Sequence, residues 1–570
     1  NARYVPDSVP LVAETLEESG YTTAAFVSGF PLSERFGLER GFGVYDDEMN
    51  QVGAERSARV TTDRAIDWLK ASSSEPLFIW VHYFDPHHPY EPPMPYDDQY
   101  PENPYLGEVA AMDEQLGRLV SAFESQTEGR AAILVAGDHG ESLGEHGEEQ
   151  HGHLLYQGTM HVPLVVVGPD VSPLATDRPV SIRRVFHTIL DLAGIGSDQS
   201  LLSNEEEIVL GEAMKPYLNY GWQPQVMAIE GSTKVIHDGK VLVFDVIEDP
   251  EEQNDLSGEA ALSRELRQAV REYPVPSIAE ATGPMEIDDE DRKQLASLGY
   301  VASDTRPVIR VDAPRPTEMT GLFPLLDRAS DLFSRDDYRA AIPLLESILE
   351  RDPENLMTAL RLAAAHSALG NDDQAMAAFR RARAIAPDSP DVDHYLALHL
   401  LRRGDWQEAL PLVEEVLDEN PNRLPAIEAM AEIRARQGRI DQALSLWKRI
   451  DAERELSEGE LLTVGRLAME TGDTQTAIRT FETLRGRTEE AFDHHLELGV
   501  LYLDARRFED ARRALERVSP THPAYPMALF KRAQVSVLLE EPDADEWIAR
   551  AREHADEVTG PLIERERLFR

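Results

Sequence analysis

An aspartate and a histidine, Asp138 and His139, stand together at the end of the apolar run 131–136, in the sequence Gly-Asp-His-Gly-Glu. The run is typical of a strand, and open α/β sheets bind ligands at the carboxyl ends of their strands. A carboxylate beside a neutral imidazole supplies a hard oxygen and a borderline nitrogen to one divalent cation. The competing interpretation is a glycine-flanked turn in which Asp138 caps a neighbouring amide. The pair therefore predicts a metal site or a capped turn.

Further histidines flank this pair. His151 and His153 come shortly before the apolar run 162–167, and His87 follows the apolar run 77–84 in the sequence Asp-Pro-His-His-Pro-Tyr. An imidazole suits proton transfer or anion contact because its pKa lies near neutrality. These spacings predict polar side chains near the ends of three strands.

Segments 84–90 and 137–167 closely resemble sulfatases of the alkaline-phosphatase superfamily, of the arylsulfatase type. Two further stretches match, Thr-Leu-Glu-Glu-Ser-Gly-Tyr at 15–21 with its continuation to Val27, and Arg-Phe-Gly-Leu-Glu-Arg-Gly-Phe at 35–42. Several separated motifs in the family's order make the resemblance specific, and it covers roughly the first half of the chain. The resembled enzymes hydrolyse sulfate esters by in-line attack at sulfur, and their nucleophile is a formylglycine made from Cys or Ser in a Cys/Ser-x-Pro-x-Arg motif.

The resemblance also implies a set of site residues. In the family, two aspartates on the first strand and a late Asp-Asn or Asp-His pair hold a divalent metal ion, so Asp138 and His139 are the expected metal ligands, with Ca²⁺ favoured over Mg²⁺ or Mn²⁺. His87 matches a histidine that contacts the sulfate or moves a proton near it. His151 lies where the family places a sulfate donor, and His153 is the alternative because the register is open by a residue or two.

Three other histidines and the polar run 148–150 are expected to have structural rather than catalytic roles. His82 alternates within a buried strand and is expected to be a satisfied core residue. His88 and His146 are expected in loops or as partners of the metal ligands. The run Glu-Glu-Gln at 148–150 predicts a solvated loop.

The nucleophile motif is absent from the sequence. Ser8-Val9-Pro10 continues with Leu11 and Val12, and the chain contains no cysteine. In the resembled family this motif and the paired aspartates precede the helix that begins near Ser8. We therefore expect the chain to be truncated at its N-terminus, with the formylglycine and two metal ligands in the missing segment, and to be inactive on sulfate esters as it stands.

The first half alternates helix and strand, which predicts an α/β fold with a mainly parallel sheet between helices, alkaline-phosphatase-like but incomplete. Expected helices cover 8–18, 56–70, 107–123 and 182–193, and expected strands cover 23–27, 77–84, 133–136 and 162–167. From about residue 223, short alternating strands with a turn at Asp238-Gly239 predict a small antiparallel subdomain. A helix over 288–298 precedes a proline-bearing linker.

The second half repeats with a period of 34 residues. One alanine series occupies positions 341, 375, 409, 443, 477 and 511, and a second series of small residues occupies 329, 363, 397, 431, 465 and 499. Glycines mark turns at 370, 404, 438 and 472. This pattern resembles tetratricopeptide repeats, in which small residues allow paired helices to cross closely. It predicts an all-α superhelix of about six repeats plus a cap near Ala533, with a groove for a protein or peptide partner.

The sequence thus divides into a partial catalytic domain at 1–222, its C-terminal subdomain at 223–300, a linker at 301–318 and a repeat array at 319–570. The net charge of −48, from 104 acidic and 56 basic residues, argues against a nucleic-acid binder. No apolar run approaches the ~20 residues that cross a bilayer. Without cysteine, disulfides and thiolate metal sites are excluded. The cellular compartment cannot be read from the sequence.

Three functions compete. A metal-dependent sulfatase carrying a protein-interaction array is the leading hypothesis. A phosphonate or phosphate-ester hydrolase of the same superfamily would use the same groups on a tetrahedral oxyanion, and fold alone does not select the substrate. A non-catalytic tetratricopeptide scaffold is the third hypothesis. The joint presence of Asp138, His139, His87 and His151 counts against it, because a decayed hydrolase has no reason to keep all four.

Overall fold

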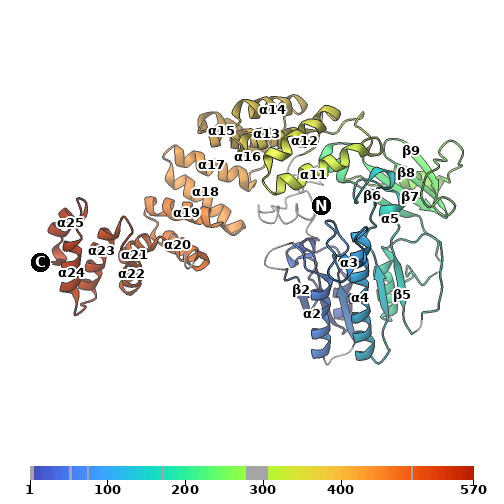
Figure 1. Cartoon of the computed structure of the whole chain (residues 1–570), viewed down its shortest axis with the longest axis horizontal. Coiled ribbons are helices and arrows are strands. Elements are labelled where there is room, and N and C mark those ends of the chain that lie inside the picture. Colours follow the sequence, from blue (N-terminus) through green and yellow to red (C-terminus); the bar gives the residue numbers. More distant parts are fainter. Residues whose placement is uncertain are drawn as a thin grey trace. The chain divides into compact units, whose positions relative to one another are not determined.

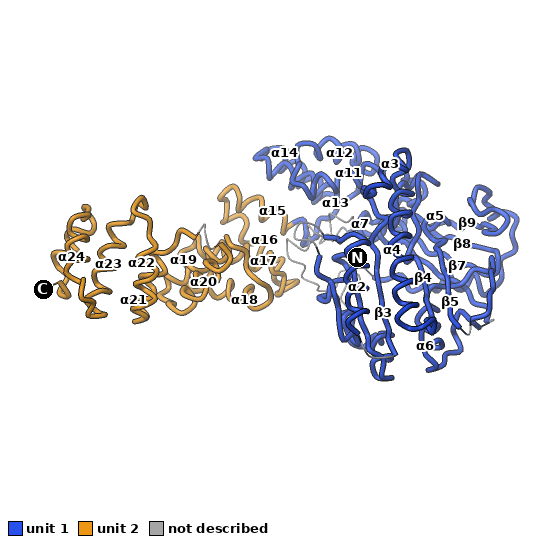
Figure 2. The backbone as a smooth tube through the Cα atoms, turned by 60° about the horizontal axis from the view of Figure 1, so that its bottom comes forward, with its two compact units in different colours: residues 1–392 blue, residues 393–570 orange. Residues whose placement is uncertain are grey.

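The computed structural model describes residues 5–49, 54–72, 76–169, 171–203, 205–277, 306–488 and 492–569. The chain forms two compact units, residues 1–392 and residues 393–570 (Figure 2). The first unit contains the strands and the first helix pairs of the repeats, and the second contains the remaining repeats (Figure 1). None of the helices in the described ranges is both long and apolar enough to span a membrane.

A three-stranded parallel sheet begins the first unit. Its order is β2-β1-β3, and the strands are β1 (Thr22–Phe26), β2 (Val44–Asp46) and β3 (Leu77–Val81). β1 is central and its Ala24 and Ala25 are fully buried, as the continuous apolar run of a covered parallel strand requires. The long helices α2 (Ala58–Ala71) and α4 (Pro104–Gln126) pack against each other, and α2 also contacts β1 and β3 (Figure 1).

The next two strands form a ladder of their own. β4 (Ile133–Ala136) and β5 (Leu164–Val167) pair antiparallel, with Leu134 opposite Val166. The expectation of a single, mainly parallel sheet is therefore correct for β1–β3 and wrong for this pair, whose strands are joined by a long loop rather than by a crossover helix. Within the described residues, no ladder connects β3 to β4. As a result, Val165 and Val167 remain half-exposed.

The predicted small subdomain is a four-stranded antiparallel sheet in the order β6-β7-β8-β9. Its strands are β6 (Val209–Ala213), β7 (Gln225–Glu230), β8 (Thr233–His237) and β9 (Val241–Asp245). β8 and β9 form the hairpin predicted at Asp238-Gly239, where Gly239 adopts a φ of 101° that favours glycine. β6 was not expected from the sequence, because its pattern Val-Leu-Gly-Glu-Ala carries only a weak strand signal.

The described residues of this part form six further helices, of which those over 12–18 and 184–192 were predicted with shifted ends, whereas the other four were not expected. They are α1 (Val12–Glu18), α3 (Tyr96–Gln99), α5 (Gln157–Met160), α6 (Arg184–Leu192), α7 (Lys215–Tyr220) and α8 (Arg264–Arg271). α1 starts later than expected, at Val12 after the N-cap residue Leu11. The helix predicted over 288–298 lies outside the described residues.

The repeats are antiparallel helix pairs, and within each compact unit neighbouring pairs pack on one another, as α12 does on α13 and α18 on α19. In the described ranges there are seven pairs: α11 (Phe323–Ser334) with α12 (Tyr338–Arg351), α13 (Leu356–Ala368) with α14 (Asp372–Ile385), α15 (Pro390–Arg403) with α16 (Trp406–Glu419), α17 (Leu424–Arg436) with α18 (Ile440–Glu453), α19 (Glu458–Thr471) with α20 (Thr474–Thr488), α21 (His495–Asp504) with α22 (Phe508–Leu515), and α23 (Tyr525–Leu538) with α24 (Ala544–Glu553). A short α25 (Thr559–Arg565) follows. Ala533, where the sequence predicts the capping unit, lies in α23.

The two small-residue series occupy the contacts between paired helices. All six alanines of the first series are fully buried. In the second series, a Cβ atom added to Gly465 would lie 2.9 Å from the Phe481 ring, and one added to Gly499 would lie 2.6 Å from Leu515 Cγ. The sequence therefore predicted these contacts correctly, because helices that cross this closely leave no room for a side chain.

Candidate functional site

Asp138 and His139 lie in a tight turn directly after β4. Asp138 Oδ1 accepts from the backbone N–H of His139 at 3.0 Å, so the carboxylate does cap an amide. The other oxygen, Oδ2, lies 3.8 Å from His139 Nε2. The next residue must be a glycine, because a Cβ on Gly140 would lie 2.3 Å from the carbonyl oxygen of Gly158. The capped-turn interpretation is therefore confirmed, whereas a metal site at the other carboxylate oxygen stays a prediction.

The imidazole of His139 is oriented by its own loop. Its Nδ1 lies 3.0 Å from the carbonyl oxygen of Gly140, which accepts a hydrogen bond when Nδ1 carries the proton. Metal-ligating histidines commonly make this kind of bond, because it leaves the lone pair of Nε2 for the cation. Asp138 and His139 thus present two donor atoms to the same side of the turn.

His151 lies against His139. The two rings stack with centroids 4.0 Å apart. His151 Nδ1 lies 3.1 Å from Glu141 Oε2, and the Glu141 side chain is buried. A buried carboxylate on Nδ1 fixes the orientation of an imidazole and leaves its Nε2 for another partner. Glu141 therefore acts as the orienting group of His151.

His87 reaches the same cluster from the loop after β3. Its ring centroid lies 5.5 Å from that of His151 and 4.2 Å from that of Phe84. Burial, with a smaller contribution from His151, lowers the pKa of His87 to about 4, so the imidazole is neutral at pH 7. Its Nδ1 lies 2.8 Å from the His88 carbonyl oxygen. Its Nε2 is buried and has no hydrogen-bond partner among the described residues.

Glu108, on α4, holds the backbone of the His87 loop. Its carboxylate accepts from the N–H of His87 at 3.1 Å and from the N–H of Glu91 at 2.6 Å. Burial raises the pKa of Glu108 to about 7. Tyr90, on the same loop, is close to Glu141, and burial together with that carboxylate raises the pKa of the tyrosine hydroxyl. The loop that carries His87 is thus anchored on both sides.

His82 fits its predicted structural role. Ser28 Oγ donates to the His82 carbonyl oxygen at 2.8 Å and lies 3.3 Å from His82 Nδ1. Burial lowers the pKa of His82 to about 4. The nearby Asp138 opposes this shift, which places the neutral His82 ring close to the Asp138 carboxylate. His82 is therefore a half-buried neighbour of the candidate site.

The structure separates the other predicted residues from this cluster. His153, the alternative to His151, is buried against Phe323 and Glu148. His146 stacks on Tyr156, so it does not partner the metal pair. His88 is exposed beside Tyr90. The expectation of a solvated loop at 148–150 is wrong for Glu148, because its carboxylate is buried and accepts from two backbone amides.

The two donors found fit part of a metal site. Asp138 Oδ2 is a hard oxygen and His139 Nε2 a borderline nitrogen, and their 3.8 Å separation is one that a single divalent cation can bridge. Within the described ranges, no group of three or more His, Asp or Glu side chains is arranged to hold a metal ion. Asp138 and His139 alone therefore do not make up such a group.

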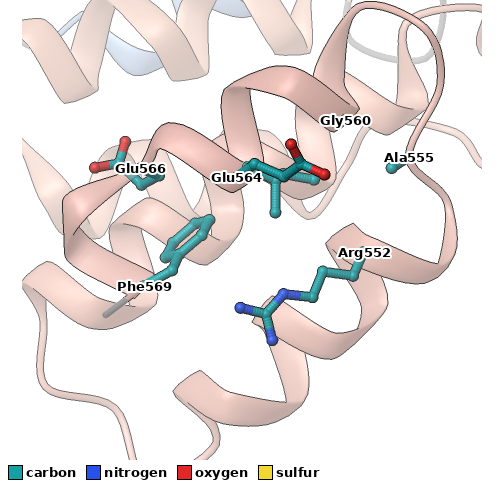
Figure 3. A pocket seen from close by; sticks show the side chains of 7 residues that line it. Arg552, Ala555, Gly560, Glu564, Glu566 and Phe569 are labelled. Atoms are coloured by element: carbon teal, nitrogen blue, oxygen red, sulfur yellow. The ribbon is translucent and has the colours of Figure 1, made fainter.

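One cavity of the described residues lies in another part of the chain. A cavity of about 380 Å³ in the last repeats is lined by Arg552, Ala555, Gly560, Ile563, Glu564, Glu566 and Phe569. Phe569 lies between the helix that carries Glu564 and the helix that carries Arg552 (Figure 3). Its lining groups include no histidine and no nucleophile. The histidine cluster at the strand ends is therefore the candidate site for chemistry.

Comparisons with known proteins assign families to both parts of the chain. The sulfatase family model matches residues 3–195. The model described as the cytochrome c-type biogenesis protein H TPR domain matches residues 325–455, and the tetratricopeptide repeat model matches 462–526 and 498–558. The chain therefore carries a sulfatase-family segment followed by tetratricopeptide repeats, and both resemblances are confirmed.

Two curated sequence relatives agree with this assignment, and one solved structure aligns with part of the chain. The uncharacterized sulfatase YidJ of Escherichia coli (strain K12) is 25% identical over 181 residues, which cover 25% of this chain and 36% of YidJ. Arylsulfatase K of Xenopus laevis is 31% identical over 99 residues, covering 17% of this chain and 18% of that enzyme. A solved YidJ structure from Bacteroides fragilis aligns with a TM-score of 0.40 and 14% identity, over 48% of this chain and 78% of that one. The matched residues thus span little more than a third of YidJ and less than a fifth of arylsulfatase K.

The sequence missed three residues of the site. Glu141 belongs to the same Gly-Asp-His-Gly-Glu string as the metal pair, so its position was a usable signal. Tyr90 follows His87 by three residues and was noted only as part of a matching segment. Glu108 gave no signal at all, because it lies inside a long helix and approaches His87 only after folding.

Proposed function

We propose that the protein containing this chain is a metal-dependent hydrolase of sulfate esters, with its site at the ends of β3 and β4. The observation that carries the proposal is the convergence of His87, His139 and His151 beside Asp138, from two segments far apart in the sequence. The sulfatase match over residues 3–195 supports the substrate class.

The residues receive distinct roles. Asp138 and His139 hold a divalent cation, with Ca²⁺ favoured and Mg²⁺ or Mn²⁺ as alternatives, and the bound cation neutralises sulfate oxygens. His151, whose Nδ1–H faces the Glu141 carboxylate, donates to a sulfate oxygen through Nε2 when both ring nitrogens carry a proton. His87 is neutral and its Nε2 has no partner among the described residues, so it can take or return a proton at the ester.

The nucleophile completes the proposal. We assign it to a formylglycine outside these 570 residues, whose sequence contains no Cys/Ser-x-Pro-x-Arg motif. The attack at sulfur would then join this residue to the groups described above. The histidines contribute orientation and proton transfer rather than the covalent step.

Aryl sulfate hydrolysis by the protein expressed from its complete coding sequence tests the assignment. We expect His87→Ala and His151→Ala each to lower kcat by about 10²–10⁴-fold, the range of a lost general acid or base. His88→Ala is the matched control, because His88 adjoins His87 but is exposed, and it should leave kcat unchanged. Turnover that survives both histidine changes would contradict the proposed site.

Substrate and metal assays separate the rival functions. Faster turnover of a phosphonate or phosphate ester than of the aryl sulfate would favour the related hydrolases. Calorimetric binding of Ca²⁺ or Mn²⁺ that is lost on Asp138→Ala would support the metal pair. No metal affinity and no hydrolysis by the complete protein would favour the non-catalytic scaffold.

We also propose that the tetratricopeptide array binds a protein or peptide partner. Stacked helix pairs of this kind present extended surfaces suited to an extended chain or a helix. Peptide-display selection against the complete chain tests this role. Failure to enrich any peptide that competes for the repeats would count against it.

A further inference from the structure

The segment that carries His151 also contacts the first repeat. This segment, residues 145–155, begins with the 3₁₀ turn η3 (Glu145–Gly147), which packs against a second 3₁₀ turn, η5 (Thr320–Leu322), just before α11. The approach is close, because a Cβ added to Gly147 would lie 3.0 Å from the Cβ of Thr320. The first repeat therefore borders the loop of the candidate site.

His153 is the centre of this contact. Its ring is 1% exposed and stacks on Phe323, the first residue of α11, with ring centroids 4.4 Å apart and an interplanar angle of 17°. Tyr220 of α7 lies nearly parallel to the same ring, 6.3 Å away. Burial lowers the pKa of His153 well below its ordinary value, so the ring is neutral. The stack is thus an apolar contact between the loop and the repeat.

Polar groups surround the stack. Asp327, one helical turn after Phe323, has its Oδ1 4.0 Å from His153 Nε2 and 3.5 Å from Lys215 Nζ. On the loop side, the Glu148 carboxylate accepts from the N–H of His153 at 2.7 Å and from the N–H of Leu154 at 3.2 Å. The backbone of the His151 loop is therefore fixed at a point that the first repeat helix covers.

Other buried contacts make this junction rigid. Trp222 Nε1 donates to Asp352 Oδ2 at 2.8 Å, and both side chains are buried. Arg315 pairs with the fully buried Asp238 at 2.8 Å, and Asp238 also accepts from Thr317. These bonds join the antiparallel subdomain to the first repeat, in agreement with the single compact unit formed by residues 1–392.

We propose that Phe323 and Asp327 of the first repeat are positioning residues of the hydrolase site: they hold His153, and through it the ring of His151 two residues earlier. The effect of these residues on turnover rests on the proposed function, whereas their effect on the position of the His151 loop does not. The first repeat then belongs to the catalytic domain and is not a separate interaction domain that could be removed without effect. Loosening the junction should disturb His151 without touching any group that meets the substrate.

Two conservative substitutions in the complete protein test the proposal, each with a matched control. Phe323→Leu removes the stacked ring but keeps an apolar side chain, and Asp327→Asn removes the charge but keeps the shape. Their controls are Phe481→Leu, an equally buried phenylalanine of α20, and Asp331→Asn, one turn further along α11 and similarly exposed. The first readout is amide hydrogen exchange of residues 148–155, and the second is the separate measurement of kcat and KM on an aryl sulfate.

We expect Phe323→Leu and Asp327→Asn to speed amide hydrogen exchange in 148–155 by about fivefold or more. The amides of this segment exchange when it opens locally, and weaker contacts with the first repeat make that opening more frequent. The two substitutions should lower kcat by a similar factor with KM nearly unchanged, and the controls should do neither. Unchanged exchange in both variants, or equal acceleration in the controls, would overturn the proposal. If the wild-type protein hydrolyses no ester, the proposed function fails. The hydrogen-exchange result still tests whether Phe323 and Asp327 hold the segment 148–155.

Discussion

The α/β part and the repeats bury their cores through contacts of different range. In the α/β part, Thr22 pairs with Leu77 and Phe26 pairs with Val81, so the core depends on residues brought together from distant segments. In the repeats, each helix packs chiefly on the next, as α17 does on α18 and α19 on α20. Local packing makes stability approximately a sum over neighbouring repeats. The stability of the α/β part is not such a sum, because the loss of one segment removes the packing partners of several other segments.

The difference extends to charged groups. The α/β part places Lys234 and Glu252 in full burial, 2.7 Å apart, where β8 meets the loop after β9. The repeats keep ion pairs such as Lys448–Asp473 at the surface, with side chains 43% and 31% exposed. A buried pair is sensitive to the loss of either partner, whereas water replaces a partner at the surface.

Substitution of these two lysines gives the largest expected contrast. Lys234→Met strands the Glu252 carboxylate in the core and should lower the free energy of unfolding by about 3–5 kcal/mol. Lys448→Met should cost less than about 1 kcal/mol. Urea unfolding followed by hydrogen exchange in β6–β9 and in α18–α20 measures both effects. Equal costs would remove the proposed difference between the two regions.

A pH dependence from Glu148 sharpens the comparison. Burial raises its pKa from 4.5 to about 8, against the opposing effects of the His153 and Leu154 amides and of Lys215, while Asp327 adds to the rise. Because the raised pKa belongs to the folded state, this stabilising contribution is complete below about pH 4.5 and is lost as the pH rises through about 8. Glu148→Gln cannot ionise, so its stability relative to wild type should improve by about 3–4 kcal/mol between pH 5 and pH 8.

Urea unfolding of both proteins at the two pH values measures this shift. The first unit should show the effect, and the second unit serves as the internal reference. A stability difference between Glu148→Gln and wild type that stays constant with pH would show that the buried carboxyl does not titrate in this range.

The smallest expected contrast is in protease resistance. Strands β3, β4 and β5 are only partly buried, and Val167 is 55% exposed, whereas the alanines at the repeat contacts are fully buried. In the intact chain, a non-specific protease should cut within 5–203 about tenfold faster than within 393–488, because cleavage follows local opening. Digestion of the denatured chain is the control for intrinsic site preference. Comparable rates in the folded chain would contradict the comparison.

The sequence predicted the repeats almost completely. Two helices per unit, the small residues at 329 and 341 and their repeats, and the turn glycines all follow from a period that local packing imposes. All four strands expected in the first half are present within three residues of their predicted ends, and β2 and β6 were not expected, although the antiparallel subdomain that contains β6 was. The sequence predicted the residue types of the candidate site from order along the chain, but not which side chains would meet.

Only the tertiary structure determined which of these side chains are in contact. It brought His151, rather than His153, onto His139, and it buried Glu148 where a solvated loop was expected. It also set Glu108 behind His87 and Phe323 against His153. The physical reason is that these contacts join segments far apart in the chain, so no local pattern of spacing or polarity records them. The 34-residue period reveals packing between helices that are neighbours in the sequence. Contacts between distant segments leave no such pattern and form only when the chain folds.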